Sequence, residues 1–281
     1  MAEPFTVACI QTNTGNDLAA NLASAGALAR RARDAGADFI TLPEVVALIE
    51  PDHVALLATS PDEAGHPALA AFSALASELQ TWLLVGSITV GLGRGKLANR
   101  SILLDRTGGI VARYDKIHLF DVDLPNGERF RESERYRAGT GACLTRTPWG
   151  MLGMTVCYDL RFPQLYWDLA LAGADFLSVP SAFTARTGRD HWHVLLRARA
   201  IETGAYVIAP AQCGGHGGAR HSYGHSLVVD PWGTVLADGG AETGMVLAEI
   251  DPARVAEARA ALPSLANARA YDGPSSLRAA E

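Results

Sequence analysis

Residues 36–44 read GADFITLPE, and residues 173–181 read GADFLSVPS. Each copy follows a helix-like pattern, begins with a glycine and carries an apolar run that leads to a proline. Glycine often ends a helix, because it adopts the left-handed conformation without a steric penalty. The repeat therefore predicts two related β-α-β halves, with strands that end beside Glu44 and Ser181.

The segments around the two copies alternate between strand-like and helix-like patterns. Apolar residues at three- and four-residue spacing predict helices, and short apolar runs bounded by turn residues predict strands. Strands are predicted over residues 5–11, 38–43, 82–90, 101–105, 110–114, 151–157, 175–180 and 206–211, with a final hairpin around 231–233. Helices are predicted from residue 18 to a stop at Gly36 and over residues 67–79, 165–171 and 191–203. Residues 116–141 show no clear periodicity, which is typical of a functional or disordered loop.

Three residues of unusual type stand at predicted strand ends. Glu44, Lys116 and Cys157 each end or follow an apolar strand. A lone cysteine is usually a packing residue, but a buried carboxylate or ammonium is costly unless it is paired. Open α/β folds build their sites at strand ends, so Glu44, Cys157 and Ser181 are expected along one crevice. A carboxylate base, a cation and a thiol are what acyl transfer through a thioester requires.

The composition excludes several classes of protein. The chain has 281 residues, of which 48% are hydrophobic, so it can bury the core of one large domain or two small ones. A net charge of −6 gives no electrostatic basis for binding nucleic acid or an anionic membrane. No apolar stretch approaches the roughly 20 residues of a membrane span, and the opening MAEPFTVACIQ lacks the basic region of a signal peptide.

The cysteines predict the redox environment of the protein, and the last residues predict how the chain ends. The four cysteines, at positions 9, 143, 157 and 213, form no CxxC pair. We therefore expect reduced thiols in a cytoplasmic protein. The stretch from about residue 263 contains Ala, Ser, Asn and Arg and predicts a loosely packed tail.

Three segments resemble the signature segments of a known family. LPE at 42–44, YDKIHLFD at 114–121 and GMTVCYDLRFP at 153–163 are similar, in this order, to those of the nitrilase (carbon–nitrogen hydrolase) superfamily. The resemblance runs from about residue 5 to residue 250 and implies a single carbon–nitrogen hydrolase domain over residues 1–281. It also implies a Glu-Lys-Cys catalytic triad, which maps onto Glu44, Lys116 and Cys157.

The resemblance implies further site residues. The family's additional catalytic glutamate maps onto Glu132, with Glu128 and Glu134 as nearby competitors, and the backbone N–H of Tyr158 is implied as an oxyanion donor. In this scheme the triad glutamate takes the thiol proton and the lysine favours the thiolate. Two carboxylates beside one lysine would raise the pKa of one of them, giving an acid that protonates the leaving group. No metal or organic cofactor has a role.

The fold implied by the resemblance is an α/β fold, a four-layer α-β-β-α sandwich with one domain per chain. Family members pair through helices of the outer layer to give an eight-layer α-β-β-α-α-β-β-α homodimer. The helices around 165–171 and 195–201 are candidates for this contact, because they directly follow the catalytic strands. The implied partners are a small-molecule amide and a second copy of the chain, with no nucleic acid and no membrane.

The second half looks most like one branch of the superfamily. PSAF at 180–183, HWHVLLRARAIET at 191–203, AQCG at 211–214 and YGHSLVVDPWGTV at 223–235 resemble the deaminated-glutathione amidase branch. One departure is His193, where that branch commonly has Glu. The alternatives are an ω-amidase acting on α-keto acid amides, an N-carbamoyl-amino-acid hydrolase and, from a different class, an inactive scaffold protein.

Substrate contacts are expected on the loops beside these segments. The substrate of that branch carries two carboxylates, which the planar fork of arginine binds well. The candidates for carboxylate binding are Arg129, Arg131, Arg186, Arg189 and Arg220. Phe183 and His193 are further candidate substrate contacts. His191 and His193 point roughly 200° apart on a helix, so no metal site is predicted there.

Overall fold

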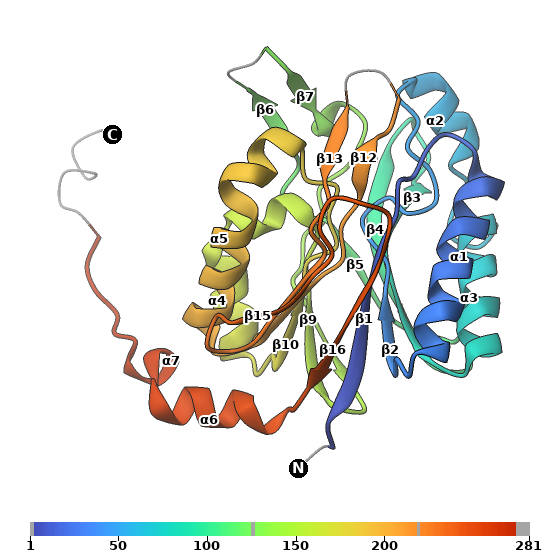
Figure 1. Ribbon diagram of the computed structural model, residues 1–281. Coiled ribbons are helices and arrows are strands. Elements are labelled where there is room, and N and C mark those ends of the chain that lie inside the picture. The colour runs from blue at the N-terminus through green and yellow to red at the C-terminus, as the bar shows by residue number, and fades with distance from the viewer. Residues whose placement is uncertain (1–2, 125–126, 218–219, 274–281) are drawn as a thin grey trace.

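The computed structural model describes residues 3–124, 127–217 and 220–273. Its centre consists of two six-stranded sheets packed against each other (Figure 1). The first sheet contains, in spatial order, β16 (Gly244–Ile250), β1 (Phe5–Gln11), β2 (Phe39–Thr41), β3 (Trp82–Gly91), β4 (Leu97–Leu104) and β5 (Ile110–Asp115). The second contains β15 (Val235–Asp238), β14 (Leu227–Val229), β11 (Tyr206–Ala209), β10 (Phe176–Ser178), β9 (Gly150–Met154) and β8 (Cys143–Thr147).

Parallel strands form the middle of each sheet. In the first sheet β2 runs parallel to both β1 and β3, and in the second β10 runs parallel to both β9 and β11. A parallel pair needs a crossover connection, which α1 (Leu18–Asp34) supplies between β1 and β2 and α4 (Pro163–Leu171) supplies between β9 and β10. The two GADF copies therefore form equivalent strands of the two sheets, β2 and β10.

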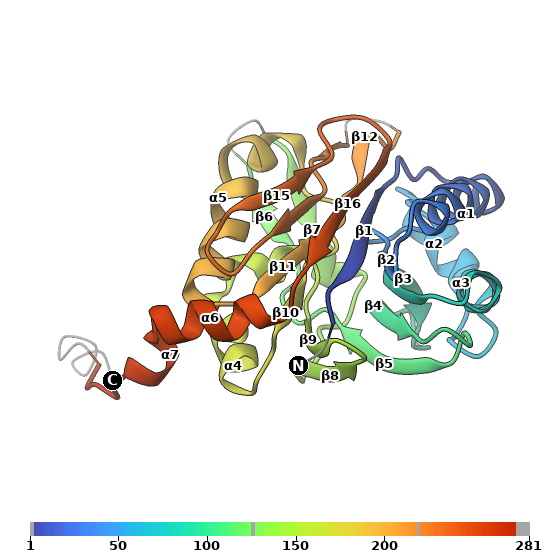
Figure 2. The same cartoon turned by 60° about the horizontal axis from the view of Figure 1, so that its bottom comes forward.

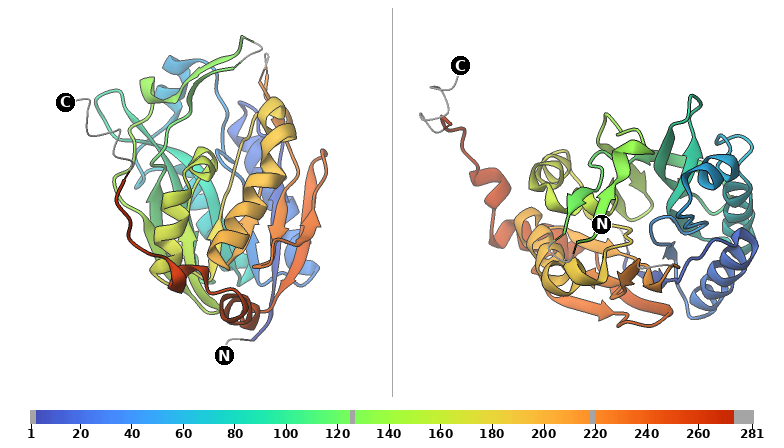
Figure 3. Two further views of the ribbon diagram at one scale, coloured as in Figure 1. Left: turned by 90° about the vertical axis from the view of Figure 1, so that its left-hand side faces the viewer. Right: turned by 90° about the horizontal axis from the view of Figure 1, so that it is seen from above.

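Helices cover the outer faces of the two sheets. Figure 3 shows α1 and α3 (Pro67–Leu79) outside the first sheet, and α4 and α5 (Ala185–Thr203) outside the second. Local sequence fixes where these helices begin: Asp17 and Thr184 cap α1 and α5 with their side chains, and α3 and α4 each start at a proline. None of the helices in the described part of the chain has the length and apolarity that a membrane span requires.

Smaller elements surround this centre. They are the helices α2 (His53–Thr59), α6 (Ala253–Ala261) and α7 (Ser264–Asn267), the short 3-10 helices η1 (Glu132–Glu134) and η2 (Cys157–Arg161), and two two-stranded sheets, β6 (Asp121–Asp123) with β7 (Arg129–Arg131) and β12 (Cys213–Gly215) with β13 (His221–Tyr223). Figure 2 shows α6 and α7 leading away from β16 along the edge of the second sheet. The two small sheets lie at one end of the molecule, at the top of Figure 1.

Both faces of the first sheet are buried, as β1 illustrates. Val7 and Cys9 belong to the core between the sheets, whereas Ala8 and Ile10 belong to the core beneath α1 and α3, since successive side chains of a strand point to opposite faces. The close approach of the halves depends on Gly86, where a Cβ atom would lie 1.9 Å from a backbone oxygen and 2.6 Å from the Cβ of Pro180. Any larger residue there would push the strand ends apart.

The predicted strands and helices are present with boundaries shifted by a few residues, and the mixed α/β class is confirmed. Several smaller or edge elements were not predicted, namely α2, β6, β7, η1, β8, η2, β12, β13, β16, α6 and α7. One predicted boundary was wrong, because β9 ends at Met154 and Cys157 instead begins η2. Within the predicted tail, α7 has no buried residue, and residues 274–281 lie outside the described residues.

Candidate active site

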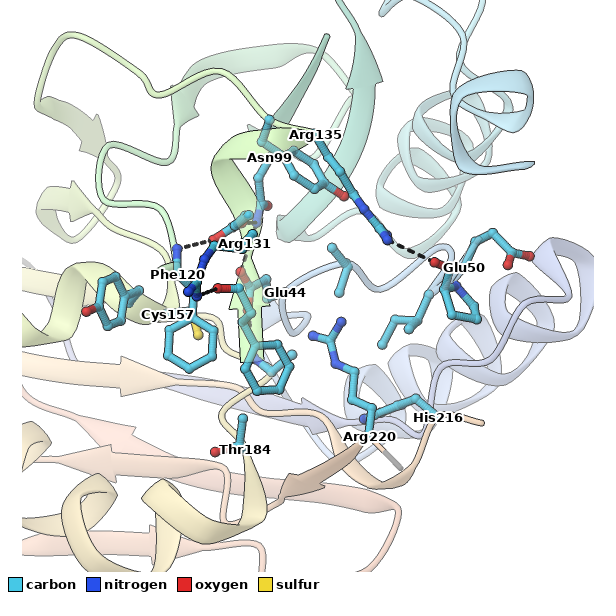
Figure 4. A pocket seen from close by; sticks show the side chains of 18 of the residues that line it. Glu44, Glu50, Asn99, Phe120, Arg131, Arg135, Cys157, Thr184, His216 and Arg220 are labelled. Carbon is cyan, nitrogen blue, oxygen red and sulfur yellow. Dashed lines mark hydrogen bonds between the residues drawn. The ribbon is translucent and has the colours of Figure 1, made fainter. Parts of the chain in front are cut away.

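A cavity of about 410 Å³ opens at the ends of strands from both sheets (Figure 4). Glu44 follows β2, Lys116 follows β5, and Cys157 lies three residues after β9, and all three line this cavity. The predicted crevice therefore brings Glu44 and Cys157 together. Ser181 is different: it is fully buried, its hydroxyl donates to the carbonyl of Val179 at 3.0 Å, and the wall is formed instead by the residues after it.

Cys157 sits at a sharp turn between strand and helix. Its φ of 48° lies in the left-handed region, which is uncommon for a residue other than glycine and is typical of a nucleophile elbow. The turn is fixed on both sides: the backbone N–H of Cys157 donates to the carbonyl of Pro180 at 3.0 Å, and that of Val156 donates to the carboxylate of Asp159 at 2.8 Å. Cys157 therefore forms an elbow between β9 and η2.

Asp159 and Arg161, the two charged residues that follow Cys157 in η2, make different contacts. Asp159 is fully buried and pairs with His118 at 2.7 Å, while also accepting the hydroxyl of Tyr114 at 2.7 Å. Arg161 lies over the rings of Tyr158 and Phe183 at 5.9 and 5.2 Å, and no carboxylate of the described residues is within 4 Å of it. The guanidinium of Arg161 therefore stacks on the aromatic wall of the cavity.

A buried network of charges stands next to the thiol. The ammonium Nζ of Lys116 lies 3.0 Å from Oε1 of Glu44 and 2.8 Å from Oε2 of Glu132. The amide of Asn99 donates to the same two carboxylates, at 2.8 and 3.2 Å. The other oxygen of Glu44 accepts the backbone N–H of Ala182 at 2.8 Å. Such charges persist in an interior only when their hydrogen-bonding groups are paired, as they are here.

The surroundings set the proton positions in this network. Burial opposes the charge on Lys116, but Glu132 and Glu44 outweigh it and keep the pKa of the ammonium well above its ordinary value. Burial likewise opposes the charge on Glu44, yet Lys116 and a hydrogen bond with Cys157 hold the pKa of this carboxyl below its ordinary value. Burial first, and then the charge of Glu44, raise the pKa of the Cys157 thiol, against the opposing effect of Lys116.

This balance changes one expectation from the sequence. Lys116 was expected to favour a thiolate, and its charge does lower the pKa of the thiol, but burial and the charge of Glu44 outweigh it. The resting state instead pairs a protonated thiol with an ionised Glu44, so the carboxylate is placed to take the proton as the sulfur attacks.

Glu132, onto which the resemblance maps the additional glutamate, lies beside Lys116. Among the described carboxylates, only those of Glu44 and Glu132 lie within 4 Å of Lys116 Nζ. The competitors Glu128 and Glu134 do not reach the ammonium, although Glu134 lines the outer part of the cavity. Glu132 also accepts the backbone N–H of Phe120 at 2.6 Å, which fixes the long loop against the site.

The other predicted contact residues divide into two groups. Tyr158 and Phe183 line the cavity. Arg186 and His193 do not, because both project from α5 away from it: Arg186 is 59% exposed with Asp190 at 3.8 Å, and His193 bonds to Asp238 at 3.0 Å. No described residue accepts a hydrogen bond from the backbone N–H of Tyr158, so this donor is open to a ligand.

Three of the five predicted loop arginines line the cavity, Arg129, Arg131 and Arg220. Arg129 and Arg131 are each paired with Asp123 at 2.7 Å. The guanidinium of Arg220 extends into the middle of the cavity (Figure 4), and within the described residues no carboxylate lies within 4 Å of it. Of these three arginines, Arg220 is therefore the one most open to a negatively charged ligand.

Sequence reasoning missed Asn99 and the backbone N–H of Ala182. Asn99 could have been found, since a polar side chain in the middle of the apolar strand LANRSILL needs a buried partner. The N–H of Ala182 carries no side-chain signal, because any residue type supplies the same donor.

Comparisons with known proteins agree with this geometry. The family model described as "Carbon-nitrogen hydrolase" matches residues 6–260. A curated relative from Synechocystis sp., named "Deaminated glutathione amidase", is 39% identical over 272 residues, which cover 94% of this chain and 97% of the relative.

Two solved structures have the same fold. Saccharomyces cerevisiae Nit3, described as a member of branch 10 of the nitrilase superfamily, superposes with a TM-score of 0.83 at 30% identity, covering 93% of this chain and 95% of Nit3. A mutant of the amidase from Nesterenkonia sp. AN1 superposes with a TM-score of 0.77 at 25% identity, covering 92% and 98% of the chains. Its description reports Michael addition of acrylamide at the active-site cysteine of that protein.

Proposed function

The chain belongs to the carbon–nitrogen hydrolase family, and from this premise we propose that it hydrolyses the amide bond of a small carboxylate-bearing substrate through a thioester on Cys157. The observation that carries the proposal is the buried ammonium of Lys116 held between Glu44 and Glu132, beside the thiol of Cys157. No simpler packing role requires this costly group of charges.

Acylation follows from the proton positions. As Sγ of Cys157 attacks the amide carbon, Glu44 takes the thiol proton, and the carbonyl oxygen becomes an oxyanion. The ammonium of Lys116 and the open N–H of Tyr158 are the donors for that oxyanion. The proton then passes from Glu44 to the nitrogen of the substrate, the C–N bond breaks, and the amine or ammonia departs.

Deacylation uses the same groups in reverse order. A water molecule attacks the thioester carbon while Glu44 takes one of its protons. The C–S bond breaks, the carboxylic acid product leaves, and the proton returns to the sulfur. Glu132 keeps the lysine in place through both steps, since its Oε2 lies 2.8 Å from Nζ.

We propose deaminated glutathione as the substrate, as the name of the Synechocystis relative indicates for that protein. Two features of the cavity support this choice: the guanidinium of Arg220 suits a carboxylate, and about 410 Å³ is enough for a small peptide-like amide. The runner-up is an ω-amidase that acts on α-ketoglutaramate, a smaller molecule with a single carboxylate.

Competition kinetics with deaminated glutathione, α-ketoglutaramate and glutathione test the substrate. We expect the highest kcat/KM with deaminated glutathione and negligible turnover of glutathione, whose α-ammonium would face the basic wall of the cavity. A preference for α-ketoglutaramate would move the protein to the ω-amidase branch. No turnover of any amide by a folded protein would leave the scaffold alternative.

We also propose that the chain forms a homodimer through α4 and α5, so that two α-β-β-α units join into eight layers. Large apolar side chains on these helices support the proposal: Leu171 is 57% exposed, Val194 is 67% exposed and Ile201 is 44% exposed. Light scattering at micromolar concentration should give twice the mass of the chain, and a monomer mass would rule out this assembly.

A further inference from the structure

Three side chains of types that bind metal ions meet outside the cavity. His193 comes from α5, His225 precedes β14, and Asp238 ends β15. Nε2 of His193 lies 3.0 Å from one oxygen of Asp238, and Nδ1 of His225 lies 2.8 Å from the other. One potential ligand atom from each residue lies within 4.8 Å of the other two. Segments far apart in the sequence thus present two imidazoles and one carboxylate to a single point.

The backbone fixes two of these three side chains. His225 adopts a φ of 55°, a conformation uncommon for residues other than glycine, and its carbonyl accepts the indole N–H of the buried Trp192 at 2.7 Å. Its ring stacks on Tyr223, with centroids 4.3 Å apart. Asp238 accepts the backbone N–H of Gly240 at 2.9 Å. The ligand atoms are therefore held in place by neighbours that would form a supporting shell around an ion.

We propose that His193, His225 and Asp238 form a binding site for a zinc ion. Two imidazole nitrogens and a carboxylate oxygen, with water as the fourth ligand, are a donor set that zinc accepts in tetrahedral geometry. Bonds of roughly 2.0–2.2 Å to one ion place such ligands about 3.4 Å apart, so the two hydrogen-bonded N···O distances of 3.0 and 2.8 Å have to lengthen by about half an ångström. The side chains of the three residues are 32%, 24% and 35% exposed, which leaves a path for an ion from solvent.

In the absence of an ion, the cluster is held by the hydrogen bonds of His193 and His225 to Asp238. A bound zinc ion would replace both of them. Each imidazole then carries its proton on the ring nitrogen that faces away from the ion, Nδ1 of His193 and Nε2 of His225. Neither proton is lost, and the negative charge of Asp238 is offset by the cation instead of by two N–H dipoles. The competing arrangement is the hydrogen-bonded cluster alone, and the experiment distinguishes the two.

A zinc ion here would cross-link elements that border the active site. His193 ties α5 to the loop before β14 and to the end of β15. On the same helix, Trp192 packs against Phe183 of the cavity wall, with ring centroids 5.0 Å apart. Because a ligand that binds only the folded state stabilises it, zinc is expected to raise the melting temperature.

The sequence pattern pointed away from this site. His191 and His193 do diverge as expected, since His191 lies by Arg161 and only His193 joins the cluster. The carboxylate that completes the set, Asp238, lies 45 residues from His193 in a hairpin strand. No local spacing signals it.

The test uses the full chain carrying Cys157→Ala, which removes the thiol of the cavity as a zinc ligand. Zinc binding is measured by competition with a chromophoric chelator, and melting is followed with and without zinc chloride. We expect one zinc ion per chain and a rise in melting temperature. Adding His193→Ala or His225→Ala should weaken binding by more than the roughly 10–100-fold that loss of a supporting residue costs. His191→Ala, an exposed histidine on the same helix, is the matched control and should bind like its parent.

Cobalt binding keeps the proposal testable even if a variant fails to fold. Cobalt bound to the Cys157→Ala protein should give the visible spectrum of a tetrahedral site without a sulfur-to-metal charge-transfer band. A charge-transfer band, absence of stoichiometric zinc binding, or equal affinity in folded His193→Ala and His225→Ala proteins would each overturn the site. The cluster would then be a hydrogen-bonded ion pair only.

Discussion

In the first half of the chain, the strand that begins GADF ends beside a buried carboxylate, and in the second half the equivalent strand ends beside a serine whose hydroxyl donates to the nearby carbonyl of Val179. The two six-stranded sheets are otherwise matched. Counted from β16 and from β8, the two sheets place corresponding strands in the same order and pair them in the same directions. The sheet architecture follows from apolar patterning that both halves share. The chemistry of the site follows from the few polar residues at the strand ends in which the halves differ.

The ends of the two GADF segments, which differ in sequence, contact each other in the structure. Glu44 ends the first GADF copy, and its carboxylate accepts the N–H of Ala182, the residue directly after the second copy. Pro180 in turn accepts the N–H of Cys157. The first half therefore supplies the charges, Glu44 and Lys116, and the second half supplies the thiol of Cys157 and the backbone that orients it. Substitutions in one half at a time should therefore have different effects on activity and stability.

The largest effect is expected from the second half. Cys157→Ala should reduce kcat by roughly 10⁶-fold, as removal of a nucleophile does in other hydrolases. The fold should persist, because alanine tolerates the same left-handed backbone about as well as cysteine does. Cys213→Ala, another buried free cysteine of the same half, is the control and should stay active. Turnover measured beside circular dichroism checks both, and an active Cys157→Ala enzyme would remove the thioester from the mechanism.

Next in size are substitutions of the charges in the first half. Glu44→Gln keeps an oxygen for the N–H of Ala182 but removes the base, so kcat/KM should fall by about 10²–10⁴-fold. Lys116→Met leaves Glu44 and Glu132 as neighbouring buried carboxylates, which should cost about 3–5 kcal/mol of unfolding free energy as well as activity. Urea denaturation and steady-state kinetics measure the two effects.

The control for these charges is Glu134→Gln, which changes a carboxylate that lines the same cavity without reaching Lys116. It should leave kcat within a few-fold of its starting value. If Glu134→Gln were as damaging as Glu44→Gln, the assignment of the base would have to be revised.

A smaller effect is expected from the wall of the cavity. Arg220→Gln removes a charge-assisted contact to a substrate carboxylate, worth about 1.5–3 kcal/mol, so kcat/KM for deaminated glutathione should fall roughly 10–100-fold, mostly through KM. Arg129→Gln removes an arginine that is already paired with Asp123, so it should change kcat/KM for deaminated glutathione much less. Equal losses from both substitutions would point to the overall charge of the wall and not to a specific contact.

The sequence predicted the parts of the molecule that depend on patterning and on signature segments. The strands of both halves were predicted because both faces of each sheet are buried and their apolar runs are long. The edge strands β8 and β16 were missed because their residues are mostly half-buried or exposed and their alternation is weak. The grouping of Glu44, Lys116, Cys157 and Glu132 was predicted, whereas the protonated state of the Cys157 thiol was not. Whether a thiol is protonated depends on burial and on distances to several charges, which no spacing in the chain encodes.

The smallest predicted effect concerns a hydrogen bond that joins the two halves. His216, in the second half, lines the cavity and places Nδ1 2.8 Å from the carbonyl of Thr14, just beyond β1 of the first half. Its Nε2 lies 2.7 Å from the hydroxyl of Ser222. Burial above all, and then the charges of Arg220 and His221, lower the pKa of this histidine from 6.5 to about 4.

The sign of the effect follows from which state binds the proton first. As the pH falls below 6.5, the unfolded chain protonates this histidine while the folded chain keeps it neutral until about pH 4. Its contribution to the unfolding free energy is therefore complete above pH 6.5 and is lost as the pH approaches 4, amounting to about 1–2 kcal/mol between pH 7 and pH 5. His216→Gln, which cannot titrate, should remove that part of the pH dependence. Urea denaturation of both proteins at the two pH values measures it, and identical pH dependence would show that this bond between the halves is not sensitive to protons.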